Sequence, residues 1–232
     1  MLRIKLQYSG EENLEIMNKA VNYNGRLLEL LQKLIASKND MIADLGAGNG
    51  YFVKELRELN YKNLVCVEPA QNMQKYLKEF EVFLSMEDIE DCSLDFIYSL
   101  NVLEHIENDN AVIEQIYNKL KKGGKMLIYV PAFPCLYSKM DRKVGHYRRY
   151  LKDELSKKVE RSGLIIEDCK YADFLGFFAS LIFKMLPSQS GVPSVKSIKF
   201  YDKFIFPLSV LADKITKGKL LGKNLYLVAV KK

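Results

Sequence analysis

Short apolar runs alternate with amphipathic segments along most of this chain. The apolar runs of strand length are residues 41–45, 64–67, 82–84, 94–99, 125–130, 164–171 and 225–230. Hydrophobic residues at helical spacing cover 51–59, 73–80, 109–120 and 152–161. Strands that alternate with helices at this spacing predict a mostly parallel α/β sheet with helices on both faces.

Both ends of the chain depart from this alternation. Residues 11–37 have helical spacing, with a break predicted at 22–25, where the sequence reads Asn-Tyr-Asn-Gly. Gly123-Gly124 is predicted to end the helix before the strand at 125–130. About 50 residues separate the last two strands, and they contain the apolar run 174–183. We therefore predict a single domain. Its parts are a helical leader (1–38), a cofactor-binding core (39–172), a helical insertion (173–222) and a last strand (223–232).

The cysteines bear on the cellular compartment. The chain has 232 residues, enough for one well-buried core. Its four cysteines, at 66, 92, 135 and 169, are too far apart for a zinc or redox motif. No window has the length and hydrophobicity of a membrane span or a signal peptide. These features predict a reducing, cytoplasmic location.

The basic charge is concentrated at the C-terminal end. The net charge is +6, and the segment from Lys196 to Lys232 holds nine lysines and two aspartates. The rest of the chain is therefore close to neutral, and the excess charge is a local feature.

The strongest local motif is Asp44-Leu45-Gly46-Ala47-Gly48-Asn49-Gly50, between a predicted strand and a predicted helix. Glycines let a backbone turn tightly and approach a ligand without a Cβ. Ligands of such sheets bind at the carboxyl ends of the strands. The loop is predicted to hold a nucleotide-like ligand. The alternative is a plain strand-to-helix turn.

Residues around this loop indicate which ligand it holds. Tyr51 stands where a dinucleotide fingerprint needs its third glycine. Asp44 would repel a pyrophosphate but suits an ammonium and a sulfonium group. Glu68 ends the second strand, where an acid can accept hydrogen bonds from both ribose hydroxyls, unless it is only a solvated strand-end acid. Pro69 and Ala70 would form a wall beside an adenine. These features favour S-adenosylmethionine over a nicotinamide dinucleotide.

Four motifs in order resemble the class I S-adenosylmethionine-dependent methyltransferases. They are the glycine loop, 66–69, 94–106 and 120–124. The resemblance implies a Rossmann-like, doubly wound, seven-stranded sheet with an antiparallel last strand. It also implies S-adenosyl-L-methionine as the cofactor and S-adenosyl-L-homocysteine as the product.

The same resemblance assigns further cofactor contacts. It places Ser85 and Met86 against the adenine, and Leu100 and Asn101 beside the methionine part. Such enzymes often have an acid near position 85. Because this chain has Ser85 there, Glu87 or Asp88 would have to take over that contact.

A second cluster follows the fifth predicted strand, at residues 131–150. It contains Gly145-His146-Tyr147-Arg148-Arg149-Tyr150, which resembles a bacterial subgroup with a Gly-His-x-Arg-Arg-Tyr run at this place. We interpret it as an acceptor loop, with His146 as the candidate base, Arg148 and Arg149 as a clamp for an anionic acceptor, and Tyr137 as a further catalytic candidate. The alternative is a structural loop, in which Arg149 pairs with Asp141 and His146 is a satisfied turn histidine.

The segment Asn101-x-x-Glu104-His105 resembles quinone-pathway O-methyltransferases, in which an acid replaces Asn101 and the set has been proposed to bind a divalent metal. Because one carboxylate is missing here, no metal is predicted. Glu104 and His105 are instead expected to orient their neighbours at a helix start.

The predicted function is methyl transfer to a small-molecule, glycan or lipid-linked acceptor, by O-methylation. Peripheral contact with a membrane would explain the aromatic run in 174–186 and the lysines beyond it. A pocket cover or a dimer face would explain the run equally well.

Three rival functions are disfavoured by the sequence. A nucleic-acid methyltransferase is disfavoured because Asn101 is not followed by Pro-Pro. A nicotinamide-dependent reductase is disfavoured by Tyr51 and Asp44, and a non-catalytic S-adenosylmethionine-binding protein by the intact glycine loop and Glu68. The sequence does not indicate an oligomeric state.

Overall fold

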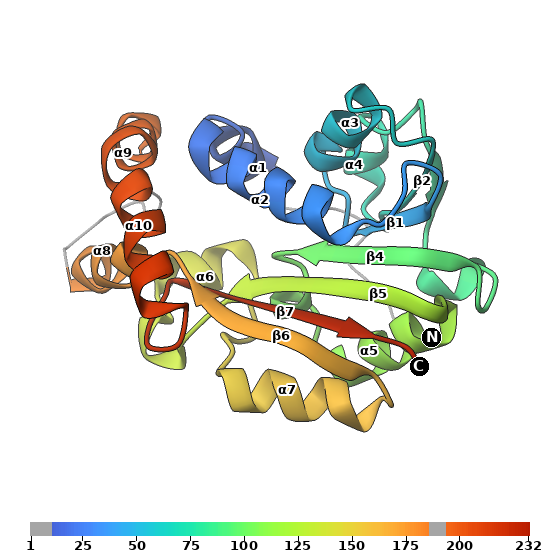
Figure 1. Ribbon diagram of the computed structural model, residues 1–232. Helices are drawn as coiled ribbons and strands as arrows, with labels where there is room; N and C mark the ends of the chain where they lie inside the picture. Colours follow the sequence, from blue (N-terminus) through green and yellow to red (C-terminus); the bar gives the residue numbers. More distant parts are fainter. Residues whose placement is uncertain (1–10, 186–193) are drawn as a thin grey trace.

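A single seven-stranded sheet organises the molecule. A computed structural model describes residues 11–185 and 194–232 (Figure 1). The strands are β1 (Met41–Leu45), β2 (Asn63–Val67), β3 (Glu81–Phe83), β4 (Leu94–Leu100), β5 (Leu120–Pro131), β6 (Ile165–Ala172) and β7 (Asn224–Val230). Their order is β3-β2-β1-β4-β5-β7-β6. Only β7 runs antiparallel to its neighbours, which confirms the predicted fold.

Helices cover both faces of this sheet (Figure 1). The helices are α1 (Glu11–Met17), α2 (Val21–Leu34), α3 (Tyr51–Glu58), α4 (Gln71–Gln74), α5 (Asp109–Lys119), α6 (Lys139–Val144), α7 (Lys152–Arg161), α8 (Phe174–Met185), α9 (Val195–Phe200) and α10 (Phe206–Thr216). Short 3₁₀ turns are η1 (Met86–Asp88), η2 (Leu103–His105) and η3 (Pro134–Leu136), and the π-helical turn η4 (Tyr201–Ile205) joins α9 to α10.

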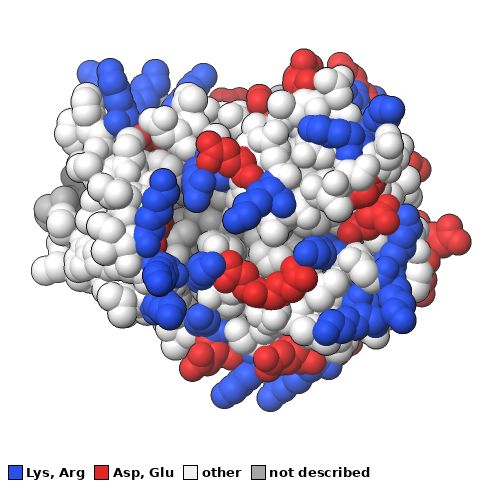
Figure 2. All heavy atoms as spheres, viewed as in Figure 1, with Lys and Arg blue, Asp and Glu red and all other residues white. Residues whose placement is uncertain are grey.

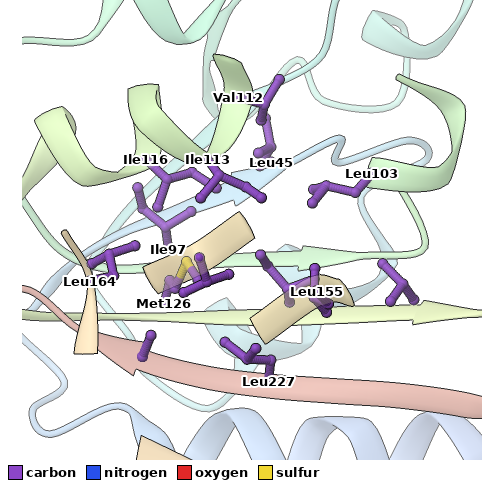
Figure 3. Packing of buried hydrophobic residues seen from close by; sticks show 14 of the residues in the cluster. Leu45, Ile97, Leu103, Val112, Ile113, Ile116, Met126, Leu155, Leu164 and Leu227 are labelled. Atoms are coloured by element: carbon purple, nitrogen blue, oxygen red, sulfur yellow. The ribbon is translucent and has the colours of Figure 1, made fainter. Parts of the chain in front are cut away.

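The strands alternate their side chains between two cores. Ile113 and Ile116 of α5 and Leu155 of α7 pack against Ile97 and Met126 on one face (Figure 3). Side chains of α2 and α3 pack on the opposite face. Because both faces are covered, the central strands are apolar throughout.

The structure corrects three predicted boundaries. The leader breaks at residues 18–20, and Asn22 to Gly25 lie inside α2. The predicted helix 73–80 is only the single turn α4. The helix before β5 ends at Lys119, and Gly123-Gly124 lie within β5, beside a register shift in its pairing with β4.

The insertion contacts the leader. Asp202 in η4 is buried, and its carboxylate accepts hydrogen bonds from the backbone N–H groups of Asn22 and Tyr23, at 3.0 and 2.9 Å. Tyr23 also packs edge-on against Phe206, with ring centroids 5.4 Å apart. Segments about 180 residues apart in sequence therefore lie together above the carboxyl end of the sheet.

Residues 1–10 of the predicted leader and 186–193 of the predicted insertion lie outside the described residues. Within 11–185 and 194–232, no helix has both the length and the apolar character needed to cross a bilayer.

Candidate active site

The glycine loop leaves β1 at the carboxyl edge of the sheet. Gly46, Gly48 and Gly50 have φ of 78°, 55° and 75°, in the left-handed region that favours glycine. A Cβ on Gly46 would overlap the side chain of Val102, and one on Gly50 would lie 2.6 Å from Leu77. At these two positions glycine is needed both for its conformation and for its lack of a side chain.

Glu68 shapes the loop from β2. One carboxylate oxygen accepts the backbone N–H of Gly48 at 2.7 Å, and the other accepts that of Ala70 at 2.9 Å. The side chain is buried, and burial raises the pKa of Glu68 above its usual value, although both hydrogen bonds lower it. Each oxygen keeps a further lone pair, so the acid can still accept from a ribose diol.

Asp44 lies at the base of the loop with 5% of its surface exposed. Burial, with a smaller contribution from nearby Glu68, raises the pKa of its carboxyl to about 7. In the part of the chain that the structure describes, no lysine or arginine forms an ion pair with Asp44. A buried carboxylate without a cation fits a ligand that carries positive charge.

Helix α1 covers the loop. A Cβ on Gly48 would lie 3.2 Å from Leu14, and the Glu11 carboxylate forms an ion pair with Lys75 at 2.7 Å. Beside this contact is a cavity of about 260 Å³. It is lined by Glu11, Leu14, Glu15, Asn18, Asn49, Tyr51, Lys54 and Tyr76.

The other predicted cofactor residues surround the same edge. Ala47 is buried in the loop, and its N–H lies 3.3 Å from the carbonyl oxygen of Val67, while Pro69 is half-buried after Glu68. Asn101 follows β4 with a φ of 57° and an exposed side chain.

The predicted adenine contacts lie at η1. Met86 is buried, whereas Ser85 caps η1 and accepts the Glu87 N–H at 3.2 Å. Asp88 accepts the Ser85 N–H at 3.1 Å, and Glu87 accepts from Gln115. Either Glu87 or Asp88 was expected to take over the contact of the acid missing at position 85. Both are hydrogen-bonded to other residues of the protein.

A buried carboxylate organises the acceptor loop. Asp141 is 1% exposed, and its oxygens contact His146 Nδ1 at 2.8 Å and Arg149 Nε at 2.9 Å. Ser138 donates to it through both its N–H and its hydroxyl. These partners outweigh the cost of burial and hold the pKa of Asp141 well below its usual range.

His146 joins this loop to η2. Its Nε2 lies 3.8 Å from a carboxylate oxygen of Glu104, and its ring lies edge-on to His105, with centroids 4.5 Å apart. Glu104 is fully buried, and neither carboxylate oxygen has a hydrogen-bond partner within the described chain. Burial raises the pKa of Glu104 to about 8 and lowers that of His105 to about 4.

This group also has the composition of a small cation site. Glu104, His105 and His146 each offer one ligand atom, and these atoms lie within 4.8 Å of one another. Glu104 and His105 belong to the segment that resembles quinone-pathway O-methyltransferases. Nothing in the spacing indicates that His146 joins them.

The two arginines are engaged in ion pairs. Arg149 binds Asp141 through Nε and a second nitrogen, which is the pairing expected of a structural loop. Arg148 pairs with buried Asp109 at 3.1 Å. The Tyr137 hydroxyl donates to the His146 carbonyl at 2.6 Å. An anion clamp stays a prediction, and it would require one of these ion pairs to open.

Sequence reasoning missed a polar group at the base of the insertion. Asp173 is buried with a φ of 64°, and it accepts hydrogen bonds from the hydroxyls of Tyr201 and Ser209. Its second oxygen has no partner among the described residues. Only the fold brings Tyr201 and Ser209 to Asp173, so the local sequence carried no signal.

Known proteins resemble this chain in both sequence and fold. Residues 18–166 match the family model described as a methyltransferase domain. A tRNA U34 carboxymethyltransferase of Helicobacter acinonychis is 25% identical over 114 residues, which are 43% of this chain and 44% of that protein. A malonyl-[acyl-carrier protein] O-methyltransferase of Calditerrivibrio nitroreducens is 27% identical over 127 residues, covering 49% and 46%. The matches thus span less than half the length of these relatives.

A solved structure extends the likeness of the fold to nearly the whole chain. The S-adenosylmethionine-dependent methyltransferase of Thermotoga maritima, described as a possible histamine N-methyltransferase, has a TM-score of 0.62 at 19% identity. The alignment covers 96% of this chain and 98% of that one. The family match therefore places this chain in the methyltransferase-domain family, and its glycine loop and buried Asp44 fit a ligand that carries positive charge.

Proposed function

We propose that this enzyme methylates a hydroxyl group of an acceptor bound beside the loop 133–150, with His146 as the general base. The observation that carries the proposal is the Asp141–His146 contact of 2.8 Å. A carboxylate at Nδ1 favours the tautomer with its proton on Nδ1, which leaves a lone pair on Nε2.

When bound, S-adenosylmethionine would supply a methyl group on a positively charged sulfur, and transfer of that methyl to the acceptor oxygen would leave neutral S-adenosyl-L-homocysteine. His146 Nε2 takes the hydroxyl proton, and Asp141 stabilises the imidazolium that forms. At neutral pH the raised pKa keeps the neighbouring Glu104 carboxyl largely protonated.

The cofactor would be held by residues from four strand ends, those of β1, β2, β3 and β4. Asp44, Gly46, Ala47, Gly48 and Gly50 would surround the methionine part and the sulfonium. Glu68 and Pro69 would contact the ribose and the adenine wall. Ser85 and Met86 would contact the adenine, and Asn101 the amino-acid end. Asp44 supports this set because it is a buried carboxylate that forms no ion pair with a basic residue of the described chain.

The test is an acceptor screen with methyl-labelled S-adenosylmethionine against hydroxylated metabolites, glycans and lipid-linked sugars. Once an acceptor is found, His146→Gln should lower kcat by about 10²–10⁴-fold, the usual contribution of a general base. Cofactor affinity should stay unchanged. Raising the pH should partly restore the activity of this variant, because hydroxide then removes the proton. An undiminished kcat would exclude His146 as the base.

A second candidate is methylation of RNA, since several relatives are tRNA U34 carboxymethyltransferases. Exposed lysines in the insertion would suit phosphate contacts. The same screen includes total tRNA. If the methyl label stays with the RNA after lipids are extracted, the result would favour methylation of RNA over a small-molecule, glycan or lipid-linked acceptor.

A further inference from the structure

Two apolar stripes lie exposed on the insertion. The stripe on α8 consists of Phe178, Leu181, Ile182 and Met185, which are 37–79% exposed. The stripe along α9, η4 and α10 consists of Phe200, Phe204, Leu208, Leu211 and Ile215, which are 52–75% exposed. Steps of three and four residues place each set on one side of its helix. These two stripes are called the apolar face below.

The apolar face is accompanied by positive charge. Seven exposed lysines belong to the same segment: Lys184, Lys196, Lys199, Lys203, Lys214, Lys217 and Lys219. The two acids of the segment point inward, where Asp202 binds backbone N–H groups of α2 and Asp213 binds those of Asp173 and Phe174. Figure 2 shows mostly uncharged surface where Figure 1 places α8 to α10, with basic side chains at its upper margin.

We propose that the apolar face and its lysines bind the surface of a bilayer that contains anionic phospholipids. Aromatic and aliphatic side chains on one side of a helix insert at the boundary between headgroups and acyl chains, and adjacent lysines are attracted to anionic headgroups. The helices α8 and α10 are too short to span the bilayer, so they would lie on it.

The charges argue against a second copy of the chain as the occupant. In a two-fold dimer the same patch would face itself, which would bring the lysines beside the apolar face toward their own copies. Since both acids of the segment are already hydrogen-bonded, neither could compensate. An anionic surface complements the patch, whereas a copy of the patch repels it.

Helix α8 connects the apolar face to the acceptor loop. The Lys184 ammonium donates to the carbonyl of Cys135 at 2.6 Å, and the ring of Phe177 lies edge-on to that of Phe133, with centroids 5.2 Å apart. If the acceptor site proposed above is correct, a face on the bilayer would bring that loop close to acceptors held in the membrane. This last step rests on the proposed function, but binding to the bilayer does not.

Vesicle flotation of the whole chain tests the proposal. One set of vesicles is phosphatidylcholine alone, and the other contains about 30% phosphatidylglycerol. The wild type should float with the anionic set and be released by about 0.5 M salt, which screens headgroup charge. The triple variant Lys199→Glu, Lys203→Glu, Lys214→Glu should bind about tenfold or more weakly. Phe204→Ser, Leu208→Ser, Ile215→Ser should do the same.

The matched control reverses three exposed lysines elsewhere, in Lys62→Glu, Lys78→Glu, Lys122→Glu. It changes the net charge equally and should still bind. All variants must keep wild-type S-adenosylmethionine binding, which shows that they fold. No flotation of the wild type, or equal loss in the control, overturns the proposal. The proposal is also overturned if the triple serine variant changes a dimer into a monomer and still floats like the wild type. If an acceptor is methylated at the same rate with and without vesicles, that result counts against delivery of the acceptor from the membrane. It does not bear on binding to the bilayer, which flotation measures separately.

Discussion

Glu68 would have two roles in the proposed cofactor site, because its carboxylate fixes the glycine loop and would also accept hydrogen bonds from the ribose. It holds the N–H groups of Gly48 and Ala70. We expect Glu68→Ala to weaken S-adenosylmethionine binding at least tenfold, or about 1.4 kcal/mol, in isothermal titration calorimetry. Glu58→Ala, an exposed acid on α3, is the control and should bind normally. Binding of NADH by the wild type, with no response to S-adenosylmethionine, would contradict the assignment of the cofactor site.

Glu104 should make stability depend on pH. Its pKa is raised from 4.5 to about 8 in the folded protein. As the pH rises from about 4.5 to 8, the unfolded chain loses this proton while the folded chain keeps it, so the free energy of unfolding falls. Glu104→Gln cannot titrate and removes that loss. Each pKa unit is worth about 1.4 kcal/mol, so the variant should gain roughly 2–4 kcal/mol on the wild type between about pH 5 and pH 8.

Urea unfolding at about pH 5, 6.5 and 8, with a chelator present, measures this difference. The exposed acid Glu107 in the same segment provides the control variant, Glu107→Gln. A constant offset between Glu104→Gln and the wild type at all three pH values would mean that the buried carboxyl is not protonated in the folded state.

The structural elements differ in how well their sequence predicts them. The strands of the parallel core are continuous apolar runs because helices cover both of their faces, so their positions are evident from the sequence. The leader is different. Asn24 is buried inside α2, and its side-chain amide donates to the Met17 carbonyl at 3.0 Å. A tertiary contact thus keeps a turn-favouring residue in a helix, and local propensity cannot reveal it.

The candidate site shows the same division. The residues of the glycine loop and Glu68 are close in sequence to the strand ends that position them, so their meeting at one edge of the sheet could be predicted. His105 meets His146 only because the acceptor loop folds back on η2, where the Tyr147 N–H donates to the Glu104 carbonyl at 2.7 Å. Such contacts depend on loop geometry that spacing does not encode.

The link between η4 and α2 should be among the strongest contacts of the insertion. The Asp202 carboxylate accepts two backbone N–H groups at the start of α2, where the positive end of the helix dipole favours it. Charged hydrogen bonds contribute about 1.5–3 kcal/mol each, so Asp202→Ala should lower the free energy of unfolding by roughly 2–4 kcal/mol in urea titration. Asp153→Ala, an exposed acid in the first turn of α7, should cost less than about 1 kcal/mol. Similar losses in both variants would contradict a specific link.

At the scale of the molecule, two sets of elements meet the carboxyl edge of the sheet from different sides. The leader helix α1 lies against the glycine loop, through Leu14. The helices α8 and α10 of the insertion pack together, and α8 contacts the acceptor loop. The cofactor and the acceptor would thus lie beneath different helices, α1 and α8, while η4 joins the insertion to α2.

This separation predicts where S-adenosylmethionine should change backbone dynamics. A ligand at about one hundred times its Kd stabilises the folded state by about 2.7 kcal/mol. For a chain of this size, that should raise the Tm by roughly 5–10 °C.

Hydrogen exchange should slow in residues 46–50 and in α1 when the cofactor binds, because Leu14 and the Glu11–Lys75 ion pair hold α1 over the loop. The rates of hydrogen exchange in α8 and α10 should be the same with and without the cofactor. Lys75→Ala should weaken the protection of α1 while leaving that of the loop. Uniform slowing in all these helices would show instead that cofactor binding tightens the molecule as one unit, and the two covers would then not be independent.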